Sequence, residues 1–326
     1  MKQLLILFSG VLLLGACGSS QKTHKGPQEV DPSTAQNVQT HMDYLAADAL
    51  AGREAGTPGI EAAAVYIENF FKKHGVQPFY PAFRDTLANF EPTAFNVVGY
   101  LPGSDPSMEK EAIIIGAHYD HIGKGEPVEG DDIANGANDN ATGTTTVLEL
   151  ARYFAKRNNN KRPLIFALFS AEEKGLLGSR HLAARMKKEG LNPYLVLNFE
   201  MTGVPMTDKP YRTYLTGYKM SDLAQKMNAY SGEELVGFLP TAKAYNLFMR
   251  SDNYPFYEEF QIPAHTFSTF DFTNFDHYHQ VGDEVNIMDM NHMSALINAM
   301  APSIEQLIND SSKVKMVDGD NSSNGM

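Results

Sequence analysis

Two adjacent glutamates, Glu172 and Glu173, stand between an apolar run over residues 163–169 and a glycine-punctuated, helix-like run that begins at Gly175. Burying two like charges side by side is costly unless a positive charge compensates them. A bound metal ion is an effective compensation, because it is the largest local charge a site can hold. The pair therefore predicts a metal site, provided that the rest of the chain supplies further ligands.

Three further polar residues stand beside apolar or helix-like runs in a comparable way. His118 comes directly after the apolar run over residues 112–117, and Glu200 follows the run over residues 194–199. Asp139 opens a helix-like run. Because the carboxyl ends of parallel strands meet at one edge of a sheet, we expect these side chains to converge there.

Each of these residues, taken alone, has a structural explanation. His118 could be a hydrogen-bonded core histidine, Asp139 a helix N-cap and Glu200 a solvated strand end. Glu172 and Glu173 could be an acidic first turn that the helix dipole favours. Together, however, oxygen and nitrogen ligands at several strand ends suit zinc or a similar divalent ion.

Apolar strands alternate with helices along most of the chain. We expect strands at residues 96–101, 112–117, 164–170, 194–199 and 264–269, and helices at 34–50, 60–74, 139–157, 176–188, 251–259 and 289–307. Residues 211–239 are expected to add a strand and a helix, and residues 122–138 a glycine-rich, acidic loop. This alternation predicts an α/β fold, with a mostly parallel central sheet and helices on both faces.

Composition excludes several classes of protein. The chain has 326 residues, of which 43% are hydrophobic, and it can form one large domain or two smaller ones. Its formal net charge of -12 argues against nucleic-acid binding and fits a site rich in carboxylates. The single cysteine, Cys17, excludes an internal disulfide and a cysteine-based zinc site.

The first residues have the parts of an export signal. Residues 1–3 carry a positive charge, residues 4–14 are apolar, and Leu14-Gly15-Ala16-Cys17 is a small-residue cleavage site. The apolar run is too short to span a bilayer well. The segment resembles the bacterial lipoprotein signal, in which the cysteine is lipidated and becomes the new N-terminus. The alternative is an ordinary secretory signal with an incidental cysteine.

These features predict a division of the chain into four parts. We expect a signal peptide over residues 1–16, a flexible tether over 17–33, one domain over 34–308, and a disordered tail over 309–326. The protein would be exported and anchored to a bacterial membrane through lipid on Cys17, facing the periplasm or the cell surface. No other stretch is long and apolar enough to cross a membrane.

The polar clusters, in their order along the chain, resemble the co-catalytic zinc aminopeptidase family (peptidase family M28). That family also includes glutamate carboxypeptidases and, as relatives, glutaminyl cyclases. The resemblance covers roughly residues 40–300, and residues 50–57 are similar to the family's N-terminal loop. The segments that carry it are His118-Tyr119-Asp120, residues 136–143, Ala171-Glu172-Glu173-Lys174-Gly175, Asn198-Phe199-Glu200-Met201 and His279-Gln280-Val281-Gly282-Asp283.

The resemblance implies a zinc exopeptidase-like, three-layer sandwich that holds two zinc ions, although other divalent metals also suit carboxylate-rich sites. Asp139 would bridge the two ions, and the peptide bond between Asp139 and Asn140 would be cis. His118 and Glu200 would complete the coordination of one ion. Glu173 and His279 would complete that of the other. The implied ligands are His118, Asp139, Glu173, Glu200 and His279.

The same resemblance assigns two catalytic roles. Glu172 would be the general base that takes a proton from a water bridging the metals and passes it to the leaving amine. Asp120 would hydrogen-bond His118 and fix its tautomer. Two positions depart from the family pattern or leave a choice. Glu200 stands where aminopeptidases commonly have aspartate, and His277 lies close to His279; we choose His279, because its spacing to a following aspartate matches the family.

Two further residues have open roles. Tyr245 is in a position to stabilise the oxyanion of the reaction, or it is a packed core tyrosine. Asp252 lies in a segment, Ser251-Asp252-Asn253, that resembles one near the family's substrate pocket. It could bind the free amino group of a substrate, or it could cap the helix that follows.

These observations favour a metal-dependent aminopeptidase that hydrolyses N-terminal residues from peptide substrates. A glutaminyl-peptide cyclase is an alternative, but those relatives use one zinc and pocket tryptophans, whereas this chain has no tryptophan and keeps His118 and Glu200. A glutamate-releasing carboxypeptidase would need basic residues near the motifs, and none is obvious. A non-catalytic peptide-binding lipoprotein would have no use for Glu172.

Overall fold

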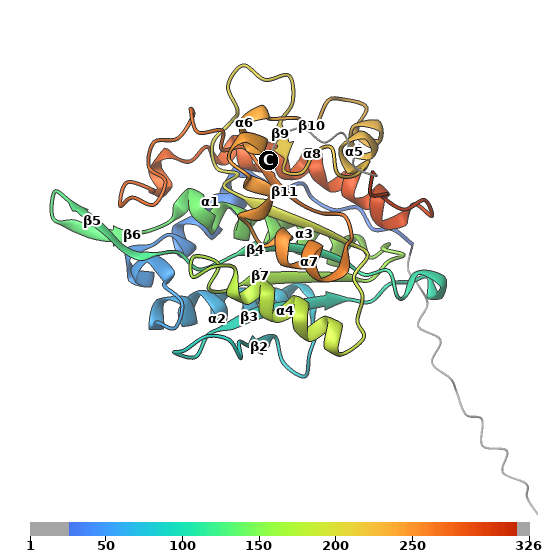
Figure 1. The fold of residues 1–326 in the computed structure, drawn as a ribbon, viewed down its shortest axis with the longest axis horizontal. Helices are drawn as coiled ribbons and strands as arrows, with labels where there is room; N and C mark the ends of the chain where they lie inside the picture. Colours follow the sequence, from blue (N-terminus) through green and yellow to red (C-terminus); the bar gives the residue numbers. More distant parts are fainter. Residues whose placement is uncertain (1–25, 318–326) are drawn as a thin grey trace, which may run out of the picture.

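A computed structural model describes residues 26–317, so the predicted signal peptide and Cys17 lie outside the described residues. A nine-stranded sheet runs through the molecule, with the strand order β1-β3-β7-β4-β8-β11-β9-β10 and β2 paired to β3 (Figure 1). The strands are β1 Gln77–Pro78, β2 Arg84–Thr86, β3 Phe95–Leu101, β4 Ile113–His118, β7 Leu164–Phe169, β8 Leu195–Glu200, β9 Thr213–Leu215, β10 Val236–Gly237 and β11 Ala264–Ser268.

The centre of the sheet is parallel. Strands β7, β4, β8 and β11 all run in one direction, and antiparallel strands flank them, with β3 on β7 and β9 on β11. The near-continuous burial of β4, β7 and β11 is typical of parallel strands covered on both faces. The fold class predicted from the sequence is therefore confirmed.

Helices form the two outer layers. One layer consists of α1 Ala35–Leu45, α2 Pro58–His74, α3 Thr142–Arg157, α5 Leu223–Ser231 and α8 Met290–Asn309. The other consists of α4 Leu177–Lys188 and α7 Asn253–Phe260. None of the helices within residues 26–317 combines the length and the apolar character that a membrane crossing needs.

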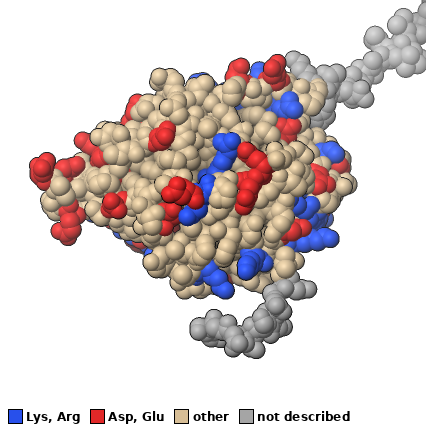
Figure 2. All heavy atoms as spheres, turned by 90° about the horizontal axis from the view of Figure 1, so that it is seen from above, with Lys and Arg blue, Asp and Glu red and all other residues tan. Residues whose placement is uncertain are grey.

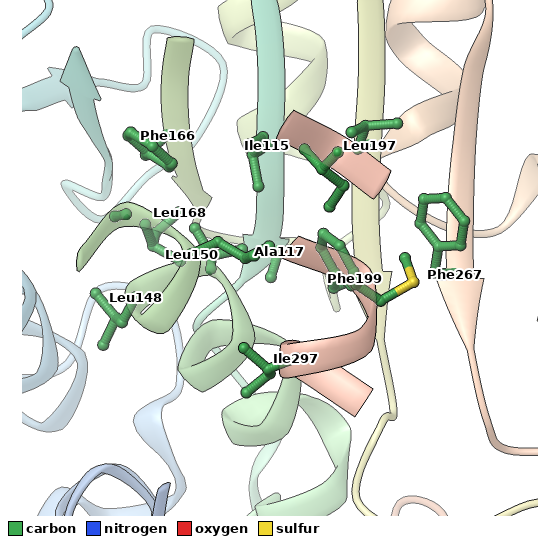
Figure 3. Packing of buried hydrophobic residues seen from close by; sticks show 14 of the residues in the cluster. Ile115, Ala117, Leu148, Leu150, Phe166, Leu168, Leu197, Phe199, Phe267 and Ile297 are labelled. Carbon is green, nitrogen blue, oxygen red and sulfur yellow. The ribbon is translucent and has the colours of Figure 1, made fainter. Parts of the chain in front are cut away.

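The core forms because strand side chains alternate between the two faces. Ile115, Phe166 and Leu197 come from three neighbouring strands and belong to the same buried cluster as Leu148 of α3 and Ile297 of α8 (Figure 3). Helix α2 ends where the sequence predicts, at a glycine with positive φ, Gly75. The packing of α3 and α8 on the sheet fixes the start of α3, and Asp139 lies in the turn just before it.

The loop expected at residues 122–138 is in part a β-hairpin, so this expectation is wrong in detail. Strands β5 Gly123–Val128 and β6 Asp131–Ala134 pair with each other and project from the body. The hairpin carries the exposed acidic residues Glu126, Glu129 and Asp131. Acidic side chains gather at the end of the molecule where it lies (Figure 2).

The expected tether and tail are also corrected within the described residues. At the start, the Gln28 amide donates to the carbonyl of Arg157 (3.1 Å), and Ser33 is buried. At the end, Val314 is only 4% exposed, and residue 316 pairs with Ser221 in a β-bridge. Segments 26–33 and 310–317 therefore pack on the domain, since each has backbone hydrogen bonds or buried side chains that the polar composition did not reveal.

Candidate metal centre

Side chains from separate segments meet outside the carboxyl ends of the parallel strands. His118 is the last residue of β4, and Glu200 is the last residue of β8. Glu173 follows the end of β7, Asp139 lies in the irregular turn before α3, and His279 comes from the loop between β11 and α8. All five side chains that the resemblance implied as ligands are thus brought together at the expected edge of the sheet.

Asp139 stands between two donor sets. Its Oδ1 lies 3.3 Å from His118 Nε2, which is 3.0 Å from Glu200 Oε1. Its Oδ2 lies 3.2 Å from His279 Nε2, which is 3.1 Å from Glu173 Oε2. Donor atoms at about 2.0–2.1 Å around a tetrahedral zinc ion are about 3.3 Å apart. The donor types and their separations therefore fit two zinc ions that share one carboxylate.

The turn that carries Asp139 is tied to the neighbouring strand. The peptide bond between Asp139 and Asn140 is cis, as the resemblance implied. The Asn140 side-chain amide donates to the carbonyl of Phe199 (2.9 Å), and its oxygen accepts from the amide of Met201 (3.1 Å). Because these two residues flank Glu200 on either side, the shared aspartate and the β8 ligand are held in register.

His121 is a candidate that the sequence reasoning missed. It is fully buried, and its Nδ1 lies 2.9 Å from Glu173 Oε1 and 3.8 Å from Asp139 Oδ2. Its Nε2 has no hydrogen-bond partner among the described residues. Together with Asp139 and Glu173, it forms a group of three side chains that could hold a metal ion. The only signal in the sequence was the run His118-Tyr119-Asp120-His121, which places two histidines within one short strand end.

Asp120 does not act as expected. Its carboxylate lies 3.7 Å from His118 Nδ1, beyond hydrogen-bonding distance, and the His118 ring contacts the Asp120 backbone carbonyl instead (3.1 Å). The carboxylate accepts from the backbone amides of Glu172 (3.1 Å) and Glu173 (3.4 Å). The prediction that the Asp120 carboxylate fixes the tautomer of His118 is therefore wrong, because that carboxylate turns towards the next strand end.

Asp283 has an equivalent part on the other side of the centre. This buried aspartate accepts from the backbone amides of Asn138 (2.7 Å) and Asp139 (3.0 Å). Burial raises the pKa of Asp283 to about 6, although the two amides lower it. Each of the two ligand-bearing turns is thus clamped by one buried carboxylate, Asp120 or Asp283, that lies outside both donor sets.

Arg53 links the end of β4 to the segment that precedes Asp139. Its side chain is 1% exposed and donates to the carbonyls of Tyr119 (2.9 Å), Asn135 (2.7 Å) and Gly136 (2.8 Å), and also to that of Leu45. All of these side-chain hydrogen bonds go to backbone carbonyls. Burial lowers its pKa to about 10, and the nearby acidic groups oppose that change.

The electrostatics of the donor sets also favour cations. Burial opposes the ionisation of Asp139, but hydrogen bonds from His118 and His279 hold its pKa far below the usual range. Burial likewise disfavours protonated His279, yet its contacts with Asp139 and Glu173 raise its pKa to about 10. The carboxylates thus attract positive charge onto the histidines. A divalent ion supplies the same compensation, and its binding displaces those protons.

Several residues around the centre have a backbone conformation that is rare for side chains other than glycine. The φ angles are 55° at Ala171, 48° at Met201 and 57° at His279. Each of these residues is a candidate ligand or lies next to one or close to one in sequence. Such conformations persist where the surrounding structure determines them, and they gather at functional sites.

Glu172 faces a pocket beside the donor sets and is not part of either set. The pocket is also lined by His118, Asp139 and His279. Burial raises the pKa of Glu172 well above its usual value; His118 opposes the shift, and neighbouring carboxylates add to it. Its carboxylate has no hydrogen bond to another described residue, so it is free to contact a water or substrate.

Asp252 lies close to Glu172 but does not line the pocket. It is fully buried, and neither carboxylate oxygen has a hydrogen-bond partner within residues 26–317. Burial raises its pKa to about 7. The adjoining Ser179 hydroxyl donates to the carbonyl of Leu176 instead (3.1 Å). Asp252 precedes α7, but its side chain does not cap that helix.

Tyr245 and His277 are not brought into the donor sets or the pocket. The Tyr245 side chain is 52% exposed and packs against Phe272, with ring centroids 4.7 Å apart, so it is not a core tyrosine. His277 contacts Phe275 rather than the carboxylates. Tyr278, which sequence reasoning did not select, lines the pocket and stacks on His279 with centroids 3.9 Å apart.

A three-layer α/β sandwich with such a centre at the carboxyl edge of its sheet is the architecture of a zinc exopeptidase. Residues 96–304 match the model of Peptidase family M28, and the chain belongs to this family.

A curated relative and several solved structures are similar to the chain. A probable leucine aminopeptidase of Arthroderma otae is 29% identical over 207 residues, which are 61% of this chain and 53% of that protein. The chain thus matches about half the length of that relative.

Among solved structures, LapA of Legionella pneumophila has a TM-score of 0.67 at 19% identity, covering 85% of this chain and 74% of that one. A zinc aminopeptidase of Bacillus subtilis has a TM-score of 0.65 at 15% identity, covering 85% and 96%. The glutaminyl cyclase of Porphyromonas gingivalis has a TM-score of 0.63 at 16% identity, covering 85% and 99%. At these identities the likeness shows the fold alone.

Proposed function

We propose that the protein is a metal-dependent aminopeptidase that removes N-terminal residues from peptides. The observation that carries this proposal is Asp139, whose two oxygens each belong to a separate histidine–carboxylate donor set. A site built for one metal has no need of both sets. The free carboxylate of Glu172 beside them is the second element that hydrolysis needs.

The ligands divide between the two sets. His118 and Glu200 would hold one zinc ion, Glu173 and His279 would hold the other, and Asp139 would be shared. When bound, the zinc ions supply Lewis acidity, which polarises a peptide carbonyl and lowers the pKa of a coordinated water. The buried clamps made by Asp120 and Asp283 keep the ligand-bearing turns in place for this purpose.

Glu172 is the proposed general base. Asp120 holds the backbone amide of Glu172 (3.1 Å), while the Glu172 carboxylate faces the pocket. From there it can accept a proton from the attacking water and deliver the proton to the leaving amine. Tyr278 lines the same pocket and takes over from Tyr245 as the candidate that donates a hydrogen bond to the developing oxyanion. Asp252 is buried next to Glu172 and does not line the pocket, so we assign it no direct contact with the substrate amino group.

A glutaminyl-peptide cyclase is the second candidate, since one such enzyme has the same fold. The first donor set argues against it, because a single-metal enzyme would not require His118 3.0 Å from Glu200.

The discriminating experiment uses the purified mature chain, loaded with zinc, on a panel of aminoacyl p-nitroanilides, unblocked peptides and N-terminal glutamine peptides. We expect chelator-sensitive release of N-terminal residues and no pyroglutamate. Pyroglutamate formation would favour the cyclase, and the absence of any chelator-sensitive cleavage would exclude the peptidase.

We also propose that the protein is exported and lipid-anchored through Cys17. The support is the sequence pattern at residues 1–17 alone. Expression in a bacterium with a lipoprotein pathway should place the chain in the membrane fraction, and Cys17→Ala should release it into the soluble fraction. Equal fractionation of both forms would exclude the anchor.

A further inference from the structure

The pocket beside the donor sets has a wall that the hydrolytic chemistry does not use. Its aromatic members are Tyr214, Phe270 and Phe272, and Thr216 and Arg250 lie in the same lining. Every carboxylate that lines the pocket belongs to the donor sets or is the proposed base. The remaining wall therefore decides which substrates fit.

Arg250 is unusual among the arginines of the described chain. It is exposed and lines the pocket, but its guanidinium makes neither a hydrogen bond nor an ion pair with another residue in 26–317. Exposed arginines elsewhere are paired; Arg180 lies 3.0 Å from Glu258, and Arg212 lies 2.9 Å from Glu233. A guanidinium presents planar, forked donors that match a carboxylate.

Thr216 supplies a second hydrogen-bond donor, a neutral hydroxyl, in the same wall. It is 3% exposed, and its hydroxyl accepts from the amide of Thr266 (3.1 Å). The hydroxyl hydrogen has no acceptor among the described residues, so it is available to a ligand in the pocket. A hydroxyl buried in this way is satisfied fully only when an acceptor reaches it.

Resting on the proposed aminopeptidase function, we propose that this wall binds a carboxylate of the substrate, with Arg250 as its main contact. The aromatic rings would pack on the methylene groups that carry the carboxylate. The charge balance agrees with this assignment. Once two divalent cations offset the carboxylates of the donor sets, Arg250 is a cationic side chain of the lining with no ion-pair partner in residues 26–317, so it can attract an anion.

The carboxylate has two possible sources in a peptide. It belongs either to an acidic side chain on the N-terminal residue or to the free C-terminus of a dipeptide. Matched pairs separate them, since only the charge differs within each pair. Glutamyl against glutaminyl p-nitroanilide tests the side chain, and Leu-Ala against Leu-Ala-amide tests the C-terminus.

We expect the zinc-loaded wild type to prefer the charged member of one pair by about tenfold or more in kcat/KM, which is typical of a charged hydrogen bond. Arg250→Gln should abolish that preference by raising KM for the charged member, with the neutral member changed less than about twofold. Arg212→Gln removes the same charge outside the pocket and should leave both pairs unchanged.

A measurement without turnover keeps this inference separate from the proposed function. Calorimetry on the zinc-loaded Glu172→Gln protein, which lacks the proposed base, compares free glutamate with free glutamine, and Leu-Ala with Leu-Ala-amide. Tighter binding of a charged member that Arg250→Gln abolishes would support the inference, even if no peptide is cleaved. The inference is overturned if neither pair shows a preference, or if Arg250→Gln weakens charged and neutral members equally.

Discussion

At the scale of single residues, the centre depends on side chains that need not touch a metal. Asp120 and Asp283 each accept two consecutive backbone amides, one pair in the Glu172–Glu173 turn and the other in the Asn138–Asp139 turn. Groups that hydrogen-bond to metal ligands or to their backbone orient those ligands, and the loss of one typically lowers metal affinity by about 10- to 100-fold. The donor geometry therefore rests on two clamps as much as on the ligands themselves.

His121 gives a prediction at this scale. Its Nδ1 lies 2.9 Å from Glu173 Oε1, so it orients the carboxylate whose other oxygen faces His279. His121→Gln should weaken binding of one zinc ion by about 10- to 100-fold, because Glu173 loses that partner. A competition titration with a chromophoric chelator measures the change.

The matched control is His277→Gln, since His277 lies in the ligand-bearing loop without contacting the carboxylates. It should bind two ions with wild-type affinity. Equal zinc affinity of the His121 variant and the wild type would show that His121 has no part in the centre.

At the scale of elements, the 3₁₀ segment Asp48–Arg53 connects parts of the chain that carry the site. Arg53 reaches from it to the carbonyls of Tyr119, Asn135 and Gly136. Tyr119 lies between His118 and Asp120, while the other two precede the Asp139 turn. The segment thus couples the end of β4 to the start of α3.

Arg53→Met should therefore destabilise the whole domain. It leaves several buried carbonyls without donors, and each such group costs about 1–3 kcal/mol, so we expect a loss on the order of 3 kcal/mol or more. Urea unfolding measures the change. Arg180→Met, at an exposed arginine, should change the free energy of unfolding by less than about 1 kcal/mol. Similar losses for both variants would contradict this role of Arg53.

A buried glutamate of helix α3, Glu149, should make the stability of the fold depend on pH. Glu149 is 1% exposed; burial opposes its ionisation, but His41, Arg152 and Ser33 hydrogen-bond to it and lower its pKa to about 2. Because the pKa of Glu149 is lower in the folded state than in the unfolded state, its ionisation stabilises the fold at pH values above the unfolded-state pKa. The contribution, on the order of 3 kcal/mol, should be lost as the pH falls from about 4.5 to about 2.

Unfolding midpoints in urea across this pH range test the expectation. Glu149→Gln should be less stable than the wild type at pH 7, and its stability should fall less steeply in acid. An unchanged slope would mean that Glu149 does not govern the acid sensitivity.

At the scale of the whole molecule, the metal centre and the start of the described chain lie at opposite ends of α3. Asp139 precedes this 16-residue helix, which is about 24 Å long, and Gln28 bonds to Arg157 at its far end.

Metal binding should stabilise the whole fold, because the donors come from separate segments that only the native state brings together. At a free zinc concentration of about 100 times Kd, one ion contributes about 2.7 kcal/mol. That corresponds to a rise in Tm of roughly 5 °C for a domain of this size. Differential scanning fluorimetry with and without chelator measures the shift. Asp139→Asn should reduce it strongly, and an undiminished shift would place the metal elsewhere.

The sequence predicts the parallel core and the convergence of the ligands, because apolar strands and the polar residues that end them are local patterns. It does not predict the short edge strands β1 and β2 or the β5–β6 hairpin, which depend on pairing rather than on hydrophobic runs. Asp120 was assigned the wrong partner for a related reason. Which way its carboxylate turns is decided by amides of the neighbouring strand end, 52 and 53 residues further along.

The proposed mechanism depends most on the different roles of Glu172 and Glu173, and one measurement tests this difference directly. The turnover of zinc-loaded Glu172→Gln is compared with that of the wild type on a peptide that the wild type cleaves, at equal metal content. We predict two bound ions in both proteins and a loss of about 10²- to 10⁴-fold in kcat for the variant, since only the proton acceptor is removed. Near-wild-type turnover, or loss of a metal ion from the variant, would contradict the assignment of Glu172 as the base.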